Sequence, residues 1–126
     1  MQGGEKAAVV LLVEDNQMNK ILVREILTLN GYAIIEASSG TEALKVLSTQ
    51  KPDLILMDLH LPEMDGVTAT RIIKSDESNR SIPVLALTAS AMKGEEDKIL
   101  CKGFDGYVAK PIEVKKLLAA ITANLA

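Results

Sequence analysis

Five short apolar runs recur along the chain, and each has the length of a β-strand. Several of them show no alternation of polar and apolar residues, which is typical of strands covered on both faces. The pattern therefore predicts five strands in the interior of the protein, at residues 8–13, 32–37, 54–57, 84–87 and 107–109.

A segment with helical spacing of apolar residues follows each run. The first has apolar residues every three or four positions, at Met18, Ile21, Leu22, Ile26 and Leu29. Such spacing predicts a helix with one apolar face. The following Asn30-Gly31 predicts where this helix ends, because Asn and Gly tolerate the left-handed conformation that commonly follows a helix.

The second helix is predicted from its start. Ser39-Gly-Thr-Glu42 is a capping-box pattern, in which the Ser and Glu side chains bind backbone amides that lack partners in the first turn. The apolar residues that follow at helical spacing, and so form the predicted inner face, are Ala43, Leu44 and Leu47.

Three further helices complete the pattern. One is predicted over 67–74, with Ala69, Ile72 and Ile73 as its apolar positions. The next, over 92–102, has a pattern broken by Gly94 and an acidic run, and its predicted buried face consists of Met92, Ile99 and Leu100. The last has a regular apolar stripe at Val114, Leu117, Leu118, Ile121 and Leu125.

Five strand-then-helix units with short connections predict an α/β fold in which helices cover both faces of a parallel sheet. The common doubly wound arrangement for five units is the flavodoxin-like (βα)5 fold, with strand order 2-1-3-4-5. The chain has 126 residues, the length of one domain. We therefore predict a single domain over 7–126, preceded by a disordered lead at 1–6.

Composition argues against several classes of partner. The formal net charge is -3 and the chain has no Trp, one Phe and two Tyr, so it offers nucleic acid neither a basic surface nor stacking platforms. The apolar stretch at 7–13 is too short to span a bilayer. A lone cysteine, Cys101, predicts a small buried side chain in a protein of a reducing compartment, which we take to be the cytoplasm.

Acidic residues follow two strands that should be neighbours in this sheet. Glu14 and Asp15 follow the first strand and Asp58 follows the third, and ligands of such folds bind where the strand order reverses between them. Clustered carboxylates repel one another unless a cation neutralises them, and oxygen ligands suit Mg²⁺. The alternative is that Glu14 and Asp15 only cap the first helix, a role that Asp58 cannot share.

Two other strand ends carry complementary groups. The fourth strand is followed by Thr88-Ala89-Ser90, whose hydroxyls can bind a phosphoryl oxygen, and the fifth by Lys110-Pro111, whose ammonium offers an anion a positive charge. Taken singly, these residues also fit a helix cap and a solvated lysine. Together with the acids they fit metal-assisted phosphoryl transfer to a carboxylate. A cis Lys110-Pro111 bond would fix where the ammonium points.

These motifs closely resemble the receiver domains of bacterial two-component response regulators. The matching stretches are LLVEDN, DLILMDLHLPEMDG, LTAS and GYVAKP, and they occur in the family's order from about Val9 to Leu125. The stretch that begins with LTAS is most similar to stand-alone receivers of the DivK type and to receivers attached to hybrid histidine kinases. Those two contexts remain open.

The resemblance implies a role for each matched residue. Asp58 corresponds to the phosphoacceptor, which takes a phosphoryl group from a phosphohistidine. The implied Mg²⁺ ligands are Asp15, Asp58 and the backbone carbonyl of His60, with Glu14 assisting through water. Thr88 and Lys110 correspond to the residues that hold the phosphoryl oxygens. The His60 side chain and Ser90 are candidates for tuning the lifetime of the acyl phosphate, although His60 fits an exposed loop residue equally well.

The resemblance also implies a switch. Thr88 and Tyr107 correspond to the residues that move on phosphorylation and change the surface made by the fourth helix, fifth strand and fifth helix. The implied partners are a histidine kinase or histidine phosphotransfer protein and a downstream protein target. The protein would act as a monomer or as a phosphorylation-dependent dimer, with no direct contact with nucleic acid and no membrane insertion.

Two other classes of function remain as alternatives. A haloacid-dehalogenase-like phosphatase also uses an aspartyl nucleophile with Mg²⁺, but it requires a second acid where this chain has His60. A flavodoxin-like cofactor-binding module would bind phosphate at its first loop, where Glu14-Asp15 would repel it. A signalling switch that transfers phosphate to itself and slowly hydrolyses it, rather than an enzyme with an external substrate, fits best.

Overall fold

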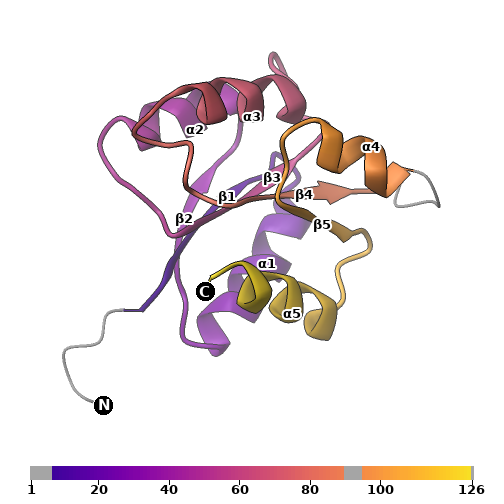
Figure 1. The fold of residues 1–126 in the computed structure, drawn as a ribbon. Coiled ribbons are helices and arrows are strands. Elements are labelled where there is room, and N and C mark those ends of the chain that lie inside the picture. The colour runs from indigo at the N-terminus through magenta and orange to yellow at the C-terminus, as the bar shows by residue number, and fades with distance from the viewer. Residues whose placement is uncertain (1–6, 90–94, 126) are drawn as a thin grey trace.

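The computed structural model describes residues 7–89 and 95–125, which form a parallel sheet flanked by helices (Figure 1). The strands are β1 (Val9–Val13), β2 (Ala33–Ala37), β3 (Leu54–Asp58), β4 (Val84–Thr88) and β5 (Gly106–Ala109). Their order is β2-β1-β3-β4-β5. The predicted fold and strand order are confirmed. Strands β3 and β4 extend one residue further than predicted, so that Asp58 and Thr88 are their last residues.

Helices cover both faces of the sheet. They are α1 (Gln17–Leu29), α2 (Gly40–Leu47), α3 (Gly66–Ser75), α4 (Glu95–Cys101) and α5 (Val114–Asn124). In Figure 1, α1 and α5 lie below the sheet, and α2, α3 and α4 lie above it. Within the described residues, no helix has the length and apolar character needed to cross a bilayer.

Alternate strand residues supply two separate cores. On the side of α2, α3 and α4, strand residues such as Leu11 and Ile55 pack with helix residues such as Ile73. On the other side, their chain neighbours such as Leu12 and Leu56 pack with residues of α1 and α5. Because both faces of β3 and β4 are fully buried, their sequences are continuously apolar.

The buried faces of several helices differ from the predicted ones. In α1 the buried residues are Val23, Ile26 and Leu27, whereas Met18 and Leu29 are 74% and 81% exposed. The other predicted apolar positions that are at least two-fifths exposed are Ile21, Leu22, Ile72, Leu100 and Val114. The spacing of apolar residues predicted these helices, but it did not determine which face meets the sheet.

The helix starts are capped by side chains. Ser39 caps α2 by accepting a hydrogen bond from the amide of Glu42 at 3.1 Å, as predicted. The Glu42 carboxylate accepts a hydrogen bond from the amide of Ser38. In a standard capping box it would bind the amide of the cap residue, which is Ser39 here. Asp65 caps α3 by accepting from the amide of Thr68 at 2.8 Å.

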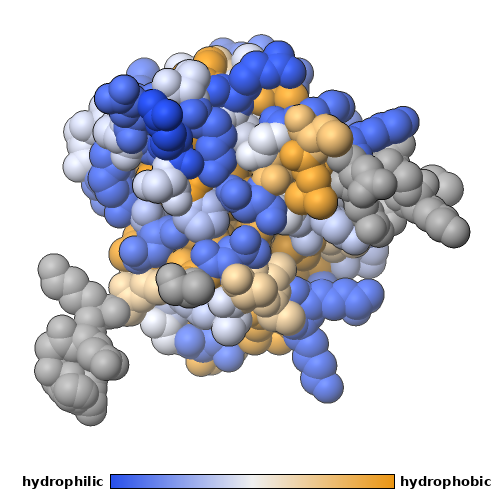
Figure 2. Space-filling view, in the orientation of Figure 1, coloured by the Kyte–Doolittle hydropathy of each residue, from blue (hydrophilic) through white to orange (hydrophobic). Residues whose placement is uncertain are grey.

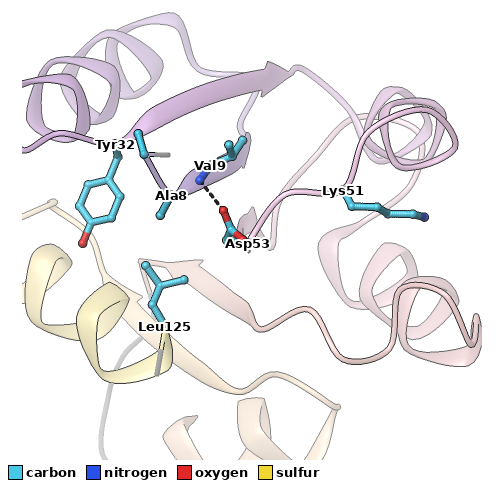
Figure 3. A pocket seen from close by; sticks show the side chains of 7 residues that line it. Ala8, Val9, Tyr32, Lys51, Asp53 and Leu125 are labelled. Carbon is cyan, nitrogen blue, oxygen red and sulfur yellow. Dashed lines mark hydrogen bonds between the residues drawn. The ribbon is translucent and has the colours of Figure 1, made fainter. Parts of the chain in front are cut away.

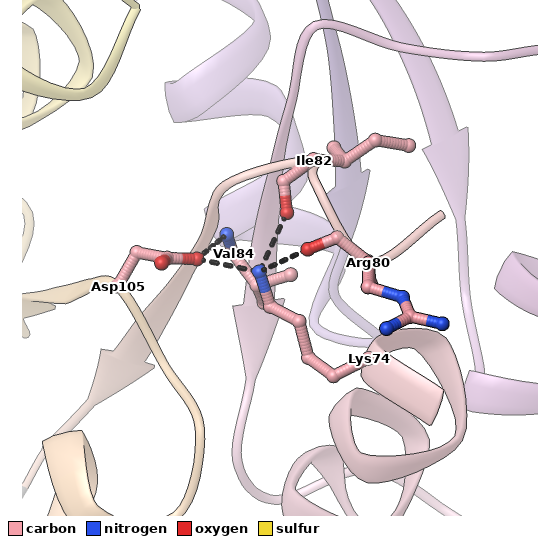
Figure 4. Close-up of polar contacts among 5 residues, drawn as sticks. All are labelled: Lys74, Arg80, Ile82, Val84 and Asp105. Atoms are coloured by element: carbon pink, nitrogen blue, oxygen red, sulfur yellow. Dashed lines mark hydrogen bonds and ion pairs between the residues drawn. The ribbon is translucent and has the colours of Figure 1, made fainter. Parts of the chain in front are cut away.

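A lysine ties together the amino-terminal ends of β4 and β5 (Figure 4). Lys74, near the end of α3, donates to the carbonyls of Arg80 and Ile82 at 3.2 and 2.8 Å. It also pairs with Asp105 at 2.8 Å. Asp105 in turn accepts the amide of Val84 at 2.8 Å. This arrangement fixes where both strands begin.

The surface is mostly hydrophilic on the face shown in Figure 2, with smaller hydrophobic areas between the polar residues. Cys101, at the end of α4, is exposed, so the prediction of a buried cysteine is wrong. The thiol lies on the outer side of α4, whereas Ile99 turns inward and is 5% exposed. The predicted lead at 1–6 and the positions Ser90 and Met92 lie outside the described residues.

Candidate functional site

The carboxyl ends of β1 and β3 bring three acidic side chains together. Glu14 and Asp15 directly follow β1, and Asp58 is the last residue of β3. One carboxylate oxygen of each lies within 4.8 Å of the others. These two strands are neighbours in the sheet and run in parallel, which is why residues 43 positions apart in the chain meet at one edge.

Glu14 is held inside the protein by its backbone and one side-chain bond. Its amide donates to the carbonyl of Ala37 at the end of β2 at 3.0 Å, and its Oε2 accepts from the amide of Asn16 at 3.2 Å. The side chain is buried, and its Oε1 accepts no hydrogen bond among the described residues. A buried carboxylate oxygen without a hydrogen bond requires a cation or a proton nearby.

The proposal that Glu14 and Asp15 serve as the cap of the first helix is not what the structure shows. Asn16 occupies the cap position of α1, and its side chain accepts the amide of Asn19 at 3.0 Å. No acidic residue lies in the first turn. Since the helix start is already satisfied by Asn16, both acids are available for another role.

Asp58 is buried and held by backbone groups of its own loop. Its Oδ1 accepts from the amide of His60 at 3.0 Å, and the side chain is about 3% exposed. The amide of Leu59 donates to the carbonyl of Leu87 in β4 at 3.3 Å. These bonds hold the backbone that follows Asp58 and fix the direction in which the carboxylate points.

Gly66 makes this loop geometry possible. A Cβ atom placed on Gly66 would lie 2.2 Å from the carbonyl oxygen of Asp58, far inside van der Waals contact. The amide of Gly66 donates to the carbonyl of Leu59 at 3.1 Å. The first residue of α3 therefore packs directly against the backbone of the acidic site, and only a residue without a side chain fits there.

Lys110 supplies the positive charge of the site. Its Nζ lies 3.2 Å from Oε1 of Glu14 and 3.2 Å from Oδ2 of Asp58. Its amide donates to the carbonyl of Thr88 at 2.8 Å, which places the lysine at the end of the β4–β5 pair. The Lys110-Pro111 peptide bond is cis.

The electrostatics of the site are set by burial and by like charge. Burial, and then the proximity of the Asp58 carboxylate, raises the pKa of Glu14 to about 7 from an ordinary value of 4.5. The Lys110 ammonium acts in the opposite direction, but with a smaller effect. One lysine thus does not neutralise the cluster fully.

The donor set fits a hard divalent cation. The cluster offers carboxylate oxygens from two buried residues and one exposed residue, Asp15, and such oxygens are the preferred ligands of Mg²⁺. The exposed position of Asp15 leaves the cluster open to solvent on one side. The Oε1 of Glu14 lies 3.2 Å from the Lys110 ammonium and accepts no hydrogen bond among the described residues, so it can also accept additional positive charge.

Of the other predicted residues, two lie on strands β4 and β5 and one lies in the loop after β3. Thr88 is the last residue of β4 and is 1% exposed. Tyr107, on β5, is half-buried and packs against the core on the side of α2, α3 and α4. The His60 side chain is exposed. Ser90 lies outside the described residues.

A hollow of about 640 Å³ lies at the amino ends of the strands, at the end of the sheet opposite the acidic cluster (Figure 3). Its polar groups already serve the fold. The Asp53 carboxylate accepts the amide of Val9 at 2.7 Å, and the Lys51 side chain, which points away from Asp53 in Figure 3, donates to Asn79 at 2.6 Å. Reactive groups thus gather at the carboxyl edge, not at this larger hollow.

Comparison with known proteins gives a consistent assignment. The response regulator receiver domain family matches residues 10–122. The polar-differentiation response regulator DivK of Brucella ovis is 45% identical over 116 residues, which are 92% of this chain and 94% of the relative. The DivK of Brucella anthropi is 43% identical over the same share of each chain.

Solved structures show the same architecture. The receiver domain of the sensor histidine kinase PA1611 from Pseudomonas aeruginosa, determined with a magnesium ion in its active-site cleft, aligns with a TM-score of 0.87 at 35% identity. The alignment covers 94% of this chain and 98% of that one. The chemotaxis response regulator CheY4 of Vibrio cholerae aligns with a TM-score of 0.89 at 26% identity, over 95% and 100%.

Sequence reasoning missed three supports of the site. They are the amide of His60 on Asp58, the close approach of Gly66 and the cap by Asn16. The motif that contains Asp58 ends at Gly66, and this glycine could have suggested a close backbone contact. A backbone amide that binds a side chain cannot be recognised from the residue type, because every residue except proline carries such an amide.

Proposed function

Because this chain belongs to the response regulator receiver domain family, we propose that it is a signalling switch that accepts a phosphoryl group from a phosphohistidine onto Asp58. The observation that carries the proposal is the environment of the Asp58 carboxylate. It is buried, bound by the His60 amide at 3.0 Å, 3.2 Å from the Lys110 ammonium and next to two further acids. This environment suits a carboxylate that reacts with a negatively charged phosphoryl group.

Mg²⁺ is the proposed cofactor. Asp15 and Asp58 would hold it by their side chains, the backbone carbonyl of His60 would complete the protein's share, and Glu14 would assist through water. A bound Mg²⁺ would neutralise charge between the Asp58 carboxylate and the phosphoryl oxygens. The buried Oε1 of Glu14, which accepts no hydrogen bond among the described residues, and the magnesium ion in the cleft of the PA1611 receiver support this assignment.

The proposed reaction is a direct transfer between two side chains. An oxygen of the Asp58 carboxylate attacks phosphorus, the P–N bond to the donor imidazole breaks, and the electron pair of that bond leaves with the imidazole nitrogen. Lys110 stabilises negative charge on the phosphoryl oxygens. The His60 amide binds the Asp58 carboxylate, and the Gly66 amide binds the carbonyl of Leu59. These two hydrogen bonds hold the carboxylate in place before the donor arrives, so little reorganisation is needed.

The output of the proposed switch begins at Thr88. After transfer, its hydroxyl would approach a phosphoryl oxygen, Tyr107 would reorient, and the surface made by α4, β5 and α5 would change to regulate a downstream protein. The link between the Thr88 carbonyl and the Lys110 amide supports coupled movement of β4 and β5. Phosphorylation would act by favouring a pre-existing active state. A cytoplasmic location and a phosphorylation-dependent dimer remain predictions.

Acetyl phosphate tests the proposal without a cognate kinase. The protein is incubated with acetyl phosphate and Mg²⁺, and its intact mass is measured. We expect one phosphate adduct on the wild type, little adduct in EDTA, and none on Asp58→Asn. An equal adduct on Asp58→Asn would contradict the assigned acceptor.

The same samples distinguish the phosphatase alternative. A haloacid-dehalogenase-like enzyme would release phosphate continuously from small phosphate esters such as p-nitrophenyl phosphate, since its aspartyl phosphate is only an intermediate. We expect no such turnover, because the position two residues after Asp58 holds His60 instead of an acid. Multiple turnovers that depend on Asp58 would favour the phosphatase.

A further inference from the structure

The end of α1 carries an asparagine followed by a glycine, Asn30-Gly31, and both residues are exposed. An asparagine can react with its own chain, because the backbone nitrogen of the next residue can attack its side-chain carboxamide. Glycine at that next position favours the attack, since it has no side chain to block the approach. The other asparagines, which are followed by Gln, Lys, Arg and Leu, are Asn16, Asn19, Asn79 and Asn124.

The fold itself requires this glycine. Gly31 has a φ of +85°, a left-handed conformation that other residues adopt only at a cost because of their Cβ atom. Its amide donates to the carbonyl of Thr28 at 3.2 Å, and the amide of Tyr32 donates to the carbonyl of Leu27 at 3.0 Å. These two bonds form a Schellman motif, a helix ending in which this position is usually glycine. The reactive pair is therefore a consequence of how α1 ends.

The Asn30 side chain also stabilises the helix end. Its Nδ2 donates to the carbonyl of Ile26 at 2.7 Å, while its backbone amide donates to the carbonyl of Leu27 at 3.1 Å. The carboxamide is thus held on the helix, and the Gly31 amide that would attack it is bound to Thr28. Both reacting groups must leave these partners before they can meet. The reaction therefore requires the end of α1 to open.

We propose that Asn30 is a modification site, at which the chain deamidates when the end of α1 opens. The Gly31 nitrogen loses its proton to solvent base and bonds to Cγ of Asn30. The bond from Cγ to Nδ2 breaks, and ammonia leaves with the electron pair of that bond and a proton from water. Water then adds to a carbonyl carbon of the resulting succinimide, and the ring C–N bond at that carbon breaks to give aspartate or isoaspartate. Water is the only co-reactant.

Either product weakens the end of α1. A carboxylate at position 30 has no hydrogen to donate to the carbonyl of Ile26, and it repels that carbonyl. The new charge also lies at the carboxyl end of a helix, where the dipole disfavours anions, and α1 has no basic residue in its last turn to offset it. Isoaspartate adds a methylene to the backbone between residues 30 and 31, which breaks the spacing of the Schellman bonds. The modified helix end therefore opens more readily.

Incubation at mildly alkaline pH in water enriched in oxygen-18 tests the chemistry. The protein is then digested in ordinary water, and peptide mass spectrometry locates each asparagine that has exchanged its NH₂ group for a heavy OH. We expect conversion at Asn30 first, with both aspartate and isoaspartate peptides. The reaction should be about tenfold or more slower in the native protein than in guanidinium chloride, because only the open fraction reacts.

Two results of this incubation would overturn the proposal. One is faster conversion at any of the other four asparagines than at Asn30. The other is an equal rate at Asn30 with and without guanidinium chloride, since the contacts at the helix end would then give no protection.

Two variants test whether a local opening controls the reaction. Tyr32 packs against the apolar cluster that includes Leu27, and such a contact commonly accompanies a Schellman motif. Tyr32→Ala should therefore speed conversion of Asn30 several-fold in the native protein and leave the rate in guanidinium chloride unchanged. Lys74→Met, which removes an ion pair of α3, should change neither rate. Equal acceleration in both variants would show that the whole protein must unfold first, against a local opening.

Asn30→Asp reproduces one product. At neutral pH its urea midpoint should lie below that of Asn30→Ala, which removes the same donor without adding charge. The difference should shrink at acidic pH, where the carboxyl group becomes protonated. An Asn30→Asp midpoint equal to or above that of the wild type would contradict the stabilising role of the carboxamide. None of these measurements depends on phosphorylation of Asp58, so their outcome is independent of the proposed function.

Discussion

At the scale of single residues, the charges of Glu14 and Lys110 largely determine the electrostatics of the acidic site. The buried Glu14 carboxylate and the Asp58 carboxylate share one ammonium, each at 3.2 Å. One positive charge cannot neutralise two negative ones, and burial raises the free energy of whatever charge remains. Without a bound cation, the acidic cluster therefore keeps an excess of negative charge. This excess favours cation binding and lowers the stability of the folded protein.

Replacing Glu14 by Gln should make stability less dependent on pH. Because the pKa of Glu14 is raised to about 7 in the folded protein, the folded state binds more protons than the unfolded state between pH 4.5 and about 7. The stability from this group is therefore complete below pH 4.5 and is lost as the pH rises through about 7. In EDTA, Glu14→Gln should exceed the wild type at pH 8 by on the order of 2 kcal/mol, and by much less at pH 5.

Urea unfolding at the two pH values measures this difference. Glu25→Gln, at an exposed position of α1, is the control and should show no such pH-dependent gain. A Glu14→Gln protein that is less stable than the wild type at pH 8 would contradict the assignment of Glu14 as an incompletely neutralised acid.

The connections between elements decide where these side chains point. The β3–α3 loop is held by the packing of Gly66 on the Asp58 backbone, and the start of β5 is held by the Lys74–Asp105 pair. The first contact lies at the carboxyl ends of the strands, beside the acidic cluster, and the second lies at their amino ends. Together they position the strand ends that carry Asp58 and Lys110.

Gly66→Ala should disrupt the site through the backbone. The new Cβ would meet the Asp58 carbonyl oxygen at 2.2 Å, so the loop or the start of α3 must shift. We expect a loss of about 2–4 kcal/mol in the free energy of unfolding, together with a lower level of phosphate adduct. Gly40→Ala is the matched control, because its Cβ would meet side chains of Met64 and Ala69 at 3.2 Å. Similar losses in both variants would contradict a specific role for Gly66.

Lys74→Met should destabilise the protein without removing any group from the acidic site. It leaves the carbonyl of Ile82 without its side-chain donor, and it leaves the carboxylate of Asp105 with the amide of Val84 but without an ammonium partner, at a cost of about 1–3 kcal/mol. Lys45→Met, at an exposed position of α2, should cost little. Urea midpoints of the two variants provide the comparison, and equal midpoints would show that the Lys74 contacts are energetically unimportant.

The limits of sequence-based prediction follow from the same physics. The strands were predictable because burial on both faces makes their sequences continuously apolar, as in β3 and β4. The positions of Asp58 and Lys110 at strand ends were predictable from those runs. The inner face of α1 was not, because Met18 and Val23 are equally apolar and only packing on the sheet buries Val23. Contacts through backbone groups, such as the His60 amide, have no side-chain signature.

At the scale of the whole molecule, the proposed switch predicts a response far from the acidic cluster. Beryllofluoride with Mg²⁺ mimics a phosphoryl group on Asp58. We expect amide shift changes at the cluster and also across residues 95–109, because β4 and β5 are joined through Thr88 and Lys110. NMR of wild type and Asp58→Asn makes the comparison. Changes limited to residues near 14–15 and 58–60 would contradict a coupled switch.

Chemical mapping of the modified residue tests the central claim most directly. After reaction with acetyl phosphate and Mg²⁺, borohydride converts an aspartyl phosphate to homoserine, which peptide mass spectrometry locates in the chain. The proposed function predicts homoserine at position 58 alone, since among the described residues only Asp58 combines burial with the His60 amide and the Lys110 ammonium. Homoserine at position 15 instead, or a phosphate adduct that yields no homoserine at position 58, would contradict it.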